Sequence, residues 1–276
     1  MTDGFVVHCL ASGSSANCLL VATPEGALLV DAGVGIRALR GWLAERGVAP
    51  EGVHGICVTH EHSDHIAAAI PWACRHDAPL IATRGTLAAV ARQDALRRTP
   101  PARVVERLDE IAVGPFAVRS FPTSHDAAEP CGFRVEWRGR AVAVATDTGV
   151  VTPEWRAACV GCELLVVEAN HDLDRLRLGP YPPSLKRRIL SADGHLDNRT
   201  AASFVLEHTA EHGPKAVWWA HLSETNNTPA LVRSAWESAW RAAGCASSPA
   251  ATAVALRDAP SLVHRTGAVA VQRSLF

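Results

Sequence analysis

The chain has 276 residues, 48% of them hydrophobic and 20% charged, and its formal net charge at pH 7 is −1. These values exclude a chain that is disordered throughout, since the apolar fraction can build a core, and a protein that is basic over its whole surface. The sequence shows no run of 18 apolar residues and no basic, apolar leader, so we expect a cytoplasmic protein.

The first third of the chain alternates short apolar runs with turns, which predicts a sheet rich in hairpins. The runs are FVVHCLA, NCLLVAT and ALLVDAG. A helix is predicted at about residues 36–46, and the buried strand HGICVT then leads into THEHSDH and a helix that begins near Ser63 or Asp64. Residues of the metal-ligating types therefore fall in a turn between a strand and a helix.

The rest of the chain predicts a helix at residues 84–98, a meander of strands, and then alternating strands and helices. The meander consists of VVERL, EIAVG, FAVRSFP, GFRVEW and AVAVATD. CELLVVEAN and KAVWWAH are predicted strands, and NRTAASFVLEHTAEHG and PALVRSAWESAWRAAG are predicted helices. This mixture predicts an α/β fold in which two mixed sheets, flanked by helices, form one domain at residues 1–244. Residues 245–276 lack periodicity and are rich in Ala, Ser and Pro, which predicts a weakly ordered tail.

Eight cysteines are scattered along the chain, which favours a reducing compartment over a framework of disulfides. Cys159 and Cys162 have the spacing of a zinc or redox pair. Because no second pair accompanies them, we interpret both as ordinary buried thiols.

The segment THEHSDH at residues 59–65 carries three imidazoles and two carboxylates directly after a buried strand. His60 and His62 can point to one side of an extended turn, while Asp64 and His65 can face a second position at the start of a helix. Further residues of ligand type follow other strands: His125, Asp147 and His221. Several ligands per ion, a shared carboxylate and an open position for water are typical of catalytic sites, so we expect two divalent ions.

These residues, together with Asp31 at the end of ALLVDAG, resemble the successive motifs of the metallo-β-lactamase superfamily from about residue 5 to residue 242. The resemblance implies the αβ/βα sandwich of that superfamily. It also implies two ligand sets and a bridging carboxylate: His60, His62 and His125; Asp64, His65 and His221; and Asp147. It implies that Asp31 holds the ligand loop in shape by hydrogen bonds; a simple turn carboxylate is the alternative.

Seven local motifs are similar to those of the YycJ/WalJ-type subgroup, which are regarded as DNA exonucleases related to tRNase Z. They are SGSSANC, THEHSDH, SHDAAEPCGF, EANHD, GPYPPSLKRRI, GHLDN and HLSETNNTP. The resemblance implies a 5′-to-3′ DNA exonuclease that uses metal-activated hydroxide for in-line attack on phosphorus. Ala16 and Asp197 depart from the glycine and serine expected at their positions, which puts in doubt the shape of the first loop and the capping of the helix after His195.

The resemblance also names residues around the metals. His195 corresponds to a histidine near the scissile phosphate and is expected to act as general acid or to contact phosphate, so it joins Asp64 and Asp31 among the catalytic candidates. Three residues at the end of a predicted strand can support ligands or contact phosphate: Glu168, Asn170 and His171. A hydrogen-bond network at the strand end is the alternative, and the turn at residues 12–17 can present backbone N–H groups to a phosphate.

Two basic stretches and the C-terminus are candidates for contacts with DNA or with a partner. The stretches contain Arg92, Arg97, Arg98, Arg103 and Arg107, and Lys186, Arg187 and Arg188, although such runs are usually solvated faces. The final residues QRSLF resemble the peptide by which many bacterial DNA enzymes dock on the sliding clamp. The resemblance implies that Leu275 and Phe276 fill an apolar pocket while Gln272 makes polar contacts. A frayed or strand-packed terminus is the alternative.

A metal centre by itself leaves the substrate open. Two metals suit phosphodiesters because they can stabilise both the attacking and the leaving oxygen. A hydrolase of a small ester, thioester or cyclic phosphodiester could use the same centre without His195, and a non-catalytic DNA-binding or clamp-binding module with a structural metal is the third possibility. Histidine-rich ligation fits zinc, whereas a bridging carboxylate and several open positions also suit manganese. A role in DNA repair follows only from the resemblance and the C-terminal peptide.

Overall fold

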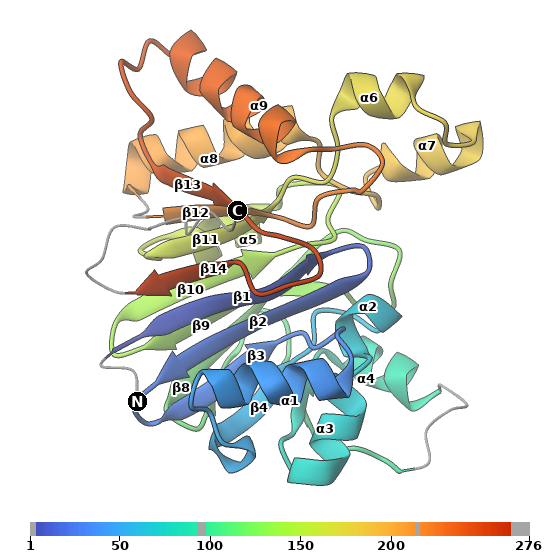
Figure 1. Ribbon diagram of the computed structural model, residues 1–276, viewed down its shortest axis with the longest axis vertical. Coiled ribbons are helices and arrows are strands. Elements are labelled where there is room, and N and C mark those ends of the chain that lie inside the picture. The colour runs from blue at the N-terminus through green and yellow to red at the C-terminus, as the bar shows by residue number, and fades with distance from the viewer. Residues whose placement is uncertain (1–3, 93–97, 214–215, 266–276) are drawn as a thin grey trace.

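The computed structural model describes residues 4–92, 98–213 and 216–265. Two seven-stranded sheets pack face to face, with helices covering their outer sides (Figure 1). This arrangement confirms the predicted α/β sandwich of two mixed sheets flanked by helices.

The first sheet has the strand order β14-β1-β2-β3-β4-β5-β6. Its strands are β1 (Val6–Gly13), β2 (Ala16–Thr23), β3 (Gly26–Val30), β4 (Val53–Cys57), β5 (Leu80–Ala82), β6 (Ala102–Val104) and β14 (Leu262–Arg265). Strands β1 to β3 are the expected antiparallel hairpins, and β3 to β6 run parallel. The prediction placed VVERL in the meander, but the structure pairs β6 with β5 of this sheet, because a crossover through a helix sets it parallel.

The second sheet has the strand order β13-β12-β11-β10-β9-β8-β7. Its strands are β7 (Glu110–Val113), β8 (Phe116–Pro122), β9 (Cys131–Trp137), β10 (Arg140–Ala145), β11 (Leu164–Glu168), β12 (Ala216–Ala220) and β13 (Ala251–Val254). The predicted meander is present as β7 to β10, and β10 to β13 run parallel.

Helices cover the outer faces of both sheets (Figure 1). They are α1 (Ile36–Glu45), α2 (Ser63–Ile66), α3 (Ala69–His76), α4 (Arg84–Ala91), α5 (Pro153–Cys159), α6 (Leu173–Leu178), α7 (Pro183–Ile189), α8 (Asn198–His212) and α9 (Pro229–Ala242), besides a 3-10 turn at Pro50–Gly52. The single helix predicted after THEHSDH is divided into α2 and α3, and the short helices α5 to α7 were not predicted. None of the helices in the described ranges is long and apolar enough to cross a membrane.

The core has three layers because the inner strands are buried on both faces. Along β12, Trp218 packs in the layer between the sheets, and its neighbour Trp219 packs in the layer under α8 and α9. Successive strand residues point to opposite faces, so both tryptophans are buried although they are adjacent in sequence. Trp72 of α3 belongs to the layer that covers the first sheet. Continuous apolar runs such as AVWWA are the sequence signature of these inner strands.

The described part of the expected tail is ordered, which corrects the prediction for residues 245–265. Strand β13 pairs with β12 in one sheet, and β14 pairs with β1 in the other. The segment is too short and too rich in Ala, Ser and Pro to show periodicity. It adds one strand to the edge of each sheet, because both sheets would otherwise leave that edge unpaired.

Cys159 and Cys162 are free, buried thiols at the end of α5. Burial raises the pKa of Cys162 to about 12, although Arg134 acts in the opposite direction. A thiol held protonated is a poor ligand and a poor nucleophile, in agreement with the interpretation of this pair as ordinary buried cysteines.

The order of β14 can be tested with two neighbouring substitutions. Leu262 is 6% exposed and packs in the inter-sheet layer, whereas the side chain of Val263 points to solvent and is 39% exposed. We expect Leu262→Ala to lower the free energy of unfolding by about 2–5 kcal/mol, and Val263→Ala to change it by less than about 0.5 kcal/mol. Urea denaturation followed by tryptophan fluorescence measures both. Equal, small effects would show that this strand contributes nothing to the core.

Candidate metal centre

The predicted ligand residues meet at one edge of the sandwich, where strands of both sheets end. In the first sheet, Asp31 directly follows β3 and His60 lies shortly after β4. In the second sheet, His125 follows β8, Glu168 is the last residue of β11, and His221 directly follows β12. Packing the sheets face to face brings these strand ends together, so each sheet supplies part of one site.

Four groups of side chains among the described residues bring their donor atoms close enough to hold an ion, and two of them, with three members each, share no residue. The other two both contain Asp147: one joins it to Glu168, His195 and His221, and the other to His60 and His65. Within a group, the donor atoms lie within 4.8 Å of one another. The two groups without a common residue are His60, His62 and His125, and Asp64, His65 and His221. These groups have the same members as the two ligand sets that the family resemblance implied.

The carboxylate of Asp147 lies between the two groups and is only 3% exposed. Its Oδ2 is 3.2 Å from Nε2 of His65. Its Oδ1 is 3.5 Å from Nε2 of His221 and 3.7 Å from Nε2 of His125. One carboxylate therefore faces histidines of both groups and could be shared between them.

Asp31 anchors the THEHSDH turn. Its Oδ1 accepts a hydrogen bond from the backbone N–H of Thr59 at 2.9 Å, and its Oδ2 lies 2.8 Å from Nδ1 of His65. Burial acts to lower the pKa of His65, but Asp31 and Asp147 raise it well above its usual value. A carboxylate on Nδ1 fixes the ring orientation and leaves Nε2 directed toward the other donors. Asp31 thus makes the expected hydrogen bonds to the ligand loop and is more than a carboxylate that stabilises its own turn.

Glu168 is fully buried and holds two histidines through one oxygen atom. Its Oε1 is 2.9 Å from Nδ1 of His195 and 2.8 Å from Nδ1 of His221, while its Oε2 accepts from the backbone N–H of Thr148 at 2.8 Å. Burial acts to raise the pKa of Glu168, but His195 and His221 lower it to about 2. The same carboxylate raises the pKa of His195 to about 9, against the effect of burial. Glu168 therefore orients both rings.

Three residues of the centre adopt the left-handed backbone region: Asp31 at φ 56°, Asp147 at φ 54° and His221 at φ 55°. Such a conformation costs on the order of 1–3 kcal/mol for a residue other than glycine, and it persists only where the surroundings enforce it. At His221, Oγ of Ser12 accepts from the backbone N–H at 2.9 Å, and Nδ2 of Asn170 donates to the carbonyl oxygen at 3.0 Å. Asn170 thus supports the backbone of a proposed ligand.

Asn17 is a site residue that the sequence analysis missed. Its Nδ2 lies 3.0 Å from Nε2 of His65 and 3.4 Å from Oδ2 of Asp64. Gly33 lets the turn of Asn17 lie close to the start of α2. Its backbone N–H donates to the carbonyl oxygen of Asn17 at 2.9 Å, and a Cβ added at Gly33 would lie 1.5 Å from the carbonyl oxygen of Asp64. The motif SGSSANC was the available signal, but the prediction considered only the backbone N–H groups of that turn.

His171 lies outside the two donor groups. Its ring is buried, and neither ring nitrogen has a hydrogen-bond partner among the residues that the structure describes. Its backbone forms an isolated bridge with Asp197. The side chain of Asp197 accepts from the backbone N–H groups of Arg199 and Thr200 at the start of α8. Aspartate in place of the expected serine at position 197 therefore still caps helix α8.

The chemistry of the donor set fits divalent metal ions. Nε2 of His221 is buried without a hydrogen-bond partner within the described ranges. Burial and the neighbouring His65 hold the pKa of His60 well below its usual value, so this imidazole is neutral and has a lone pair to donate. Buried polar atoms without partners are costly, and coordination to an ion removes that cost.

A small pocket adjoins the centre and has a volume of about 170 Å³. His125 and His195 form its wall toward the other histidines. The remaining lining residues are Ser14, Asn170, Tyr181, Leu185, Arg188, Ile189, Asp193, Gly194 and Ser223. The pocket therefore extends from the histidine cluster to helix α7.

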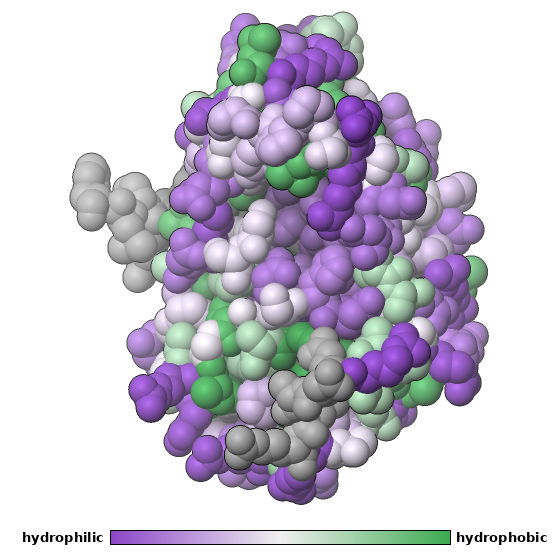
Figure 2. Space-filling model, turned by 90° about the vertical axis from the view of Figure 1, so that its right-hand side faces the viewer, coloured by the Kyte–Doolittle hydropathy of each residue, from purple (hydrophilic) through white to green (hydrophobic). Residues whose placement is uncertain are grey.

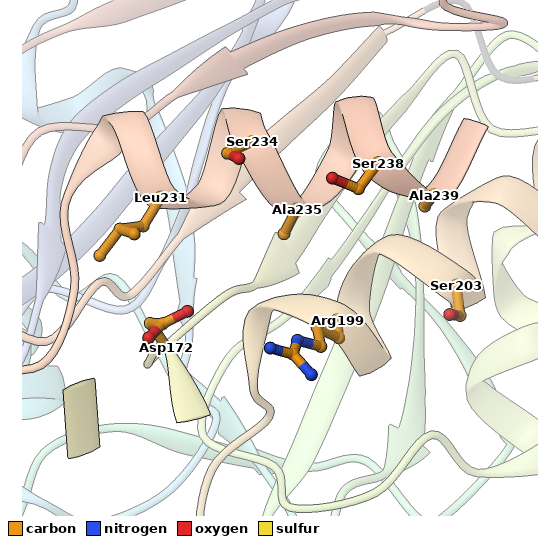
Figure 3. Close-up of a pocket in the computed structure, with 8 residues that line it drawn as sticks. All are labelled: Asp172, Arg199, Ser203, Leu231, Ser234, Ala235, Ser238 and Ala239. Atoms are coloured by element: carbon orange, nitrogen blue, oxygen red, sulfur yellow. The ribbon is translucent and has the colours of Figure 1, made fainter. Parts of the chain in front are cut away.

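A larger hollow of about 360 Å³ lies between α8 and α9 (Figure 3). Figure 3 shows the small side chains Ser234, Ala235 and Ser238 of α9 facing Arg199 and Ser203 of α8 across it. None of the donor groups found among the described residues includes a residue that lines this hollow. The smaller pocket is therefore the candidate substrate site.

The two basic stretches lie in different places. In the first, Arg103 is on β6, Arg107 faces Glu129 at 3.5 Å, and Arg97 lies outside the described residues. The second, Lys186 to Arg188, belongs to α7, and Arg188 lines the small pocket. The predicted clamp-binding residues Gln272, Leu275 and Phe276 also lie outside the described ranges.

Comparison with known proteins identifies similar sequences and folds. Residues 27–221 match the family described as Beta-lactamase superfamily domain. The chain is 39% identical over 224 residues to Exodeoxyribonuclease YycJ of Bacillus anthracis, covering 81% of this chain and 84% of that one. It is 34% identical over 231 residues to Exodeoxyribonuclease WalJ of Streptococcus pneumoniae, covering 83% and 86%. The fold resembles the metallo-beta-lactamase fold protein YhfI of Bacillus subtilis, with a TM-score of 0.71, 17% identity, and coverage of 95% and 100%.

The role of Asp31 can be tested by Asp31→Asn, since asparagine also tolerates the left-handed backbone region. The substitution removes the negative charge that Asp31 places beside His65, and this should weaken metal binding about 10- to 100-fold. Chelator competition and metal analysis of the purified protein measure the change. Asp77→Asn is the matched control, because Asp77 has φ 55° but is exposed at the end of α3. Equal metal affinity in the two variants would contradict the role.

Proposed function

This chain belongs to the β-lactamase superfamily, and on that premise we propose that it is a metal-dependent exonuclease that removes nucleotides from DNA in the 5′-to-3′ direction. The superfamily and the similar sequences make it a metal-dependent hydrolase of ester bonds. The two relatives called exodeoxyribonucleases match over most of their own length, which supports DNA as the substrate. The polarity of cutting is carried over from the resemblance.

The observation that carries the proposal is the position of Asp147 between two complete donor groups. We assign one divalent ion, zinc or manganese, to His60, His62 and His125, and a second to Asp64, His65 and His221, with Asp147 shared. When bound, two such ions supply an activated water and neutralise charge on the phosphate oxygens. A phosphodiester suits this arrangement because its attacking and leaving oxygens lie on opposite sides of phosphorus.

His195 is placed to act on the leaving group. Its side chain is 19% exposed, more than those of the neighbouring His125 and His221, and it lines the pocket beside the centre. Glu168 holds Nδ1, so Nε2 is the nitrogen free to meet the substrate. A proton donated from this position would allow the sugar oxygen to depart as an alcohol rather than an alkoxide.

Two further parts of this proposal rest on the sequence alone. Docking on a sliding clamp through Gln272, Leu275 and Phe276 stays a prediction, since these residues lie outside the described ranges. A role in DNA repair is likewise a prediction from the sequence.

Hydrolysis of end-labelled DNA tests the substrate. Metal-stripped protein reloaded separately with zinc and manganese should release nucleotides stepwise from the 5′ end. Asp147→Asn should reduce this activity at least about 100-fold, because it removes the charge that both ions would share. The exposed Asp109→Asn is the control and should retain activity. Hydrolysis of small esters or thioesters with no action on DNA would refute the exonuclease.

The role of His195 can be tested by comparing leaving groups in His195→Gln. Loss of a general acid should lower kcat on DNA about 10²- to 10⁴-fold, but should have much less effect on bis(p-nitrophenyl) phosphate, whose leaving group needs no proton. Metal content serves as the structural control, since His195 also lies near Asp147. Equal losses on both substrates with full metal content would exclude proton donation.

A further inference from the structure

Residues 173–190, here called the α6–α7 arm, form a local basic surface on a nearly neutral chain. The arm carries Arg175, Arg177, Lys186, Arg187 and Arg188 against a single acidic residue, Asp174. Figure 1 shows α6 and α7 standing out from one corner of the sandwich. The face in Figure 2 looks onto that side, and its upper part, at the height of α6 and α7, carries hydrophilic residues interspersed with some hydrophobic ones.

The base of the arm is fixed, while several of its charges are free. Leu176 and Ile189 are buried, and Nε of Arg175 donates to the carbonyl oxygen of Thr225 at 2.9 Å. Arg188 forms an ion pair with Asp126. Nζ of Lys186 donates to the carbonyl oxygen of Arg177 at 2.7 Å, and no carboxylate of the described residues pairs with it.

Arg177 and Arg187 are exposed and form no ion pair with the described residues. Together with Lys186, they present three positive charges that have no ion-pair partner in the described part of the chain. Three such charges on a rigid support are suited to a row of phosphates.

The turn between the two helices presents Tyr181, the only tyrosine of the chain. It is half-buried, and it lines the small pocket together with His125 and His195. Its neighbours Pro180, Pro182 and Pro183 restrict the backbone that carries the ring. Leu178, the last residue of α6, is 88% exposed and offers an apolar surface.

We propose that the α6–α7 arm binds a single strand of DNA, with Tyr181 stacking on the base next to the scissile phosphate and Arg177, Lys186 and Arg187 contacting successive phosphates. The proposal rests on the proposed function, because it places the strand end at the metal centre. Aromatic stacking combined with a basic track is how proteins hold single strands without reading sequence.

The size of the pocket selects a strand rather than a duplex. Its volume of about 170 Å³ is below the roughly 300–1,000 Å³ of pockets that enclose drug-sized ligands. It can hold one flat base with part of its sugar, but not a base pair. The volume therefore favours a frayed or single-stranded end as the substrate.

The test measures binding and turnover separately. Fluorescence anisotropy of a labelled thymidine oligonucleotide with phosphorothioate linkages reports affinity for the metal-loaded protein. Tyr181→Ala should weaken binding about 5- to 150-fold, and Tyr181→Phe should restore most of it, since stacking needs the ring and not the hydroxyl.

The charges are tested through salt dependence. Each phosphate contact on a single strand contributes a slope of about −0.7 to the plot of log affinity against log salt concentration. The triple variant Arg177→Ala, Lys186→Ala, Arg187→Ala should therefore have a slope shallower by about 2. The matched control replaces Arg37 and Arg40, two exposed arginines on α1, and should keep the slope of the unmodified protein.

The outcomes separate the arm from the exonuclease. If the arm variants keep their affinity and salt slope and still degrade DNA, the arm does not bind the strand, whereas the proposed exonuclease function is unaffected. Hydrolysis of bis(p-nitrophenyl) phosphate by a protein that neither binds nor cuts DNA would overturn both. Weaker binding and a shallower slope, with a greater loss of turnover on oligonucleotides than on the small diester, would support the arm.

Discussion

The buried carboxylate of Asp147 is the constraint on which the rest of the site depends. A charged group that is 3% exposed has to be compensated on both of its oxygens, and here histidines from both sheets provide the compensation. Those histidines are in turn oriented from behind, His65 by Asp31 and His221 by Glu168. Changing any one of these carboxylates therefore alters the charge balance of the whole cluster.

The sandwich supplies the geometry that this charge balance requires. Each sheet ends its parallel strands at the same edge, so short turns can carry the ligands while the strands behind them remain in the core. The strained backbone at Asp31, Asp147 and His221 is tolerated because each of these residues follows a strand that is buried along almost its whole length and packed in the core. In sites of this kind the functional residues usually lie on turns that a rigid scaffold of strands holds in position.

The parts of the structure that sequence could predict are those with a strong local pattern. Apolar runs such as AVWWA and ELLVVE predicted buried strands, and the ligand spacing of THEHSDH, with its counterparts after later strands, predicted one composite site. The short helices α5 to α7 escaped because six or seven residues contain less than two turns of periodicity. The strands β13 and β14 escaped because edge strands in an Ala-rich segment have no alternation to detect.

The sequence by itself determined the family, the kind of fold and the types of ligand, because those depend on residue identity and short-range spacing. Only the tertiary structure decided that Glu168 holds both His195 and His221, that Asn17 reaches His65, and that the basic segment around Tyr181 borders the pocket beside the centre. These pairs are far apart in the chain. No local pattern encodes them, since their proximity arises from packing one sheet against the other.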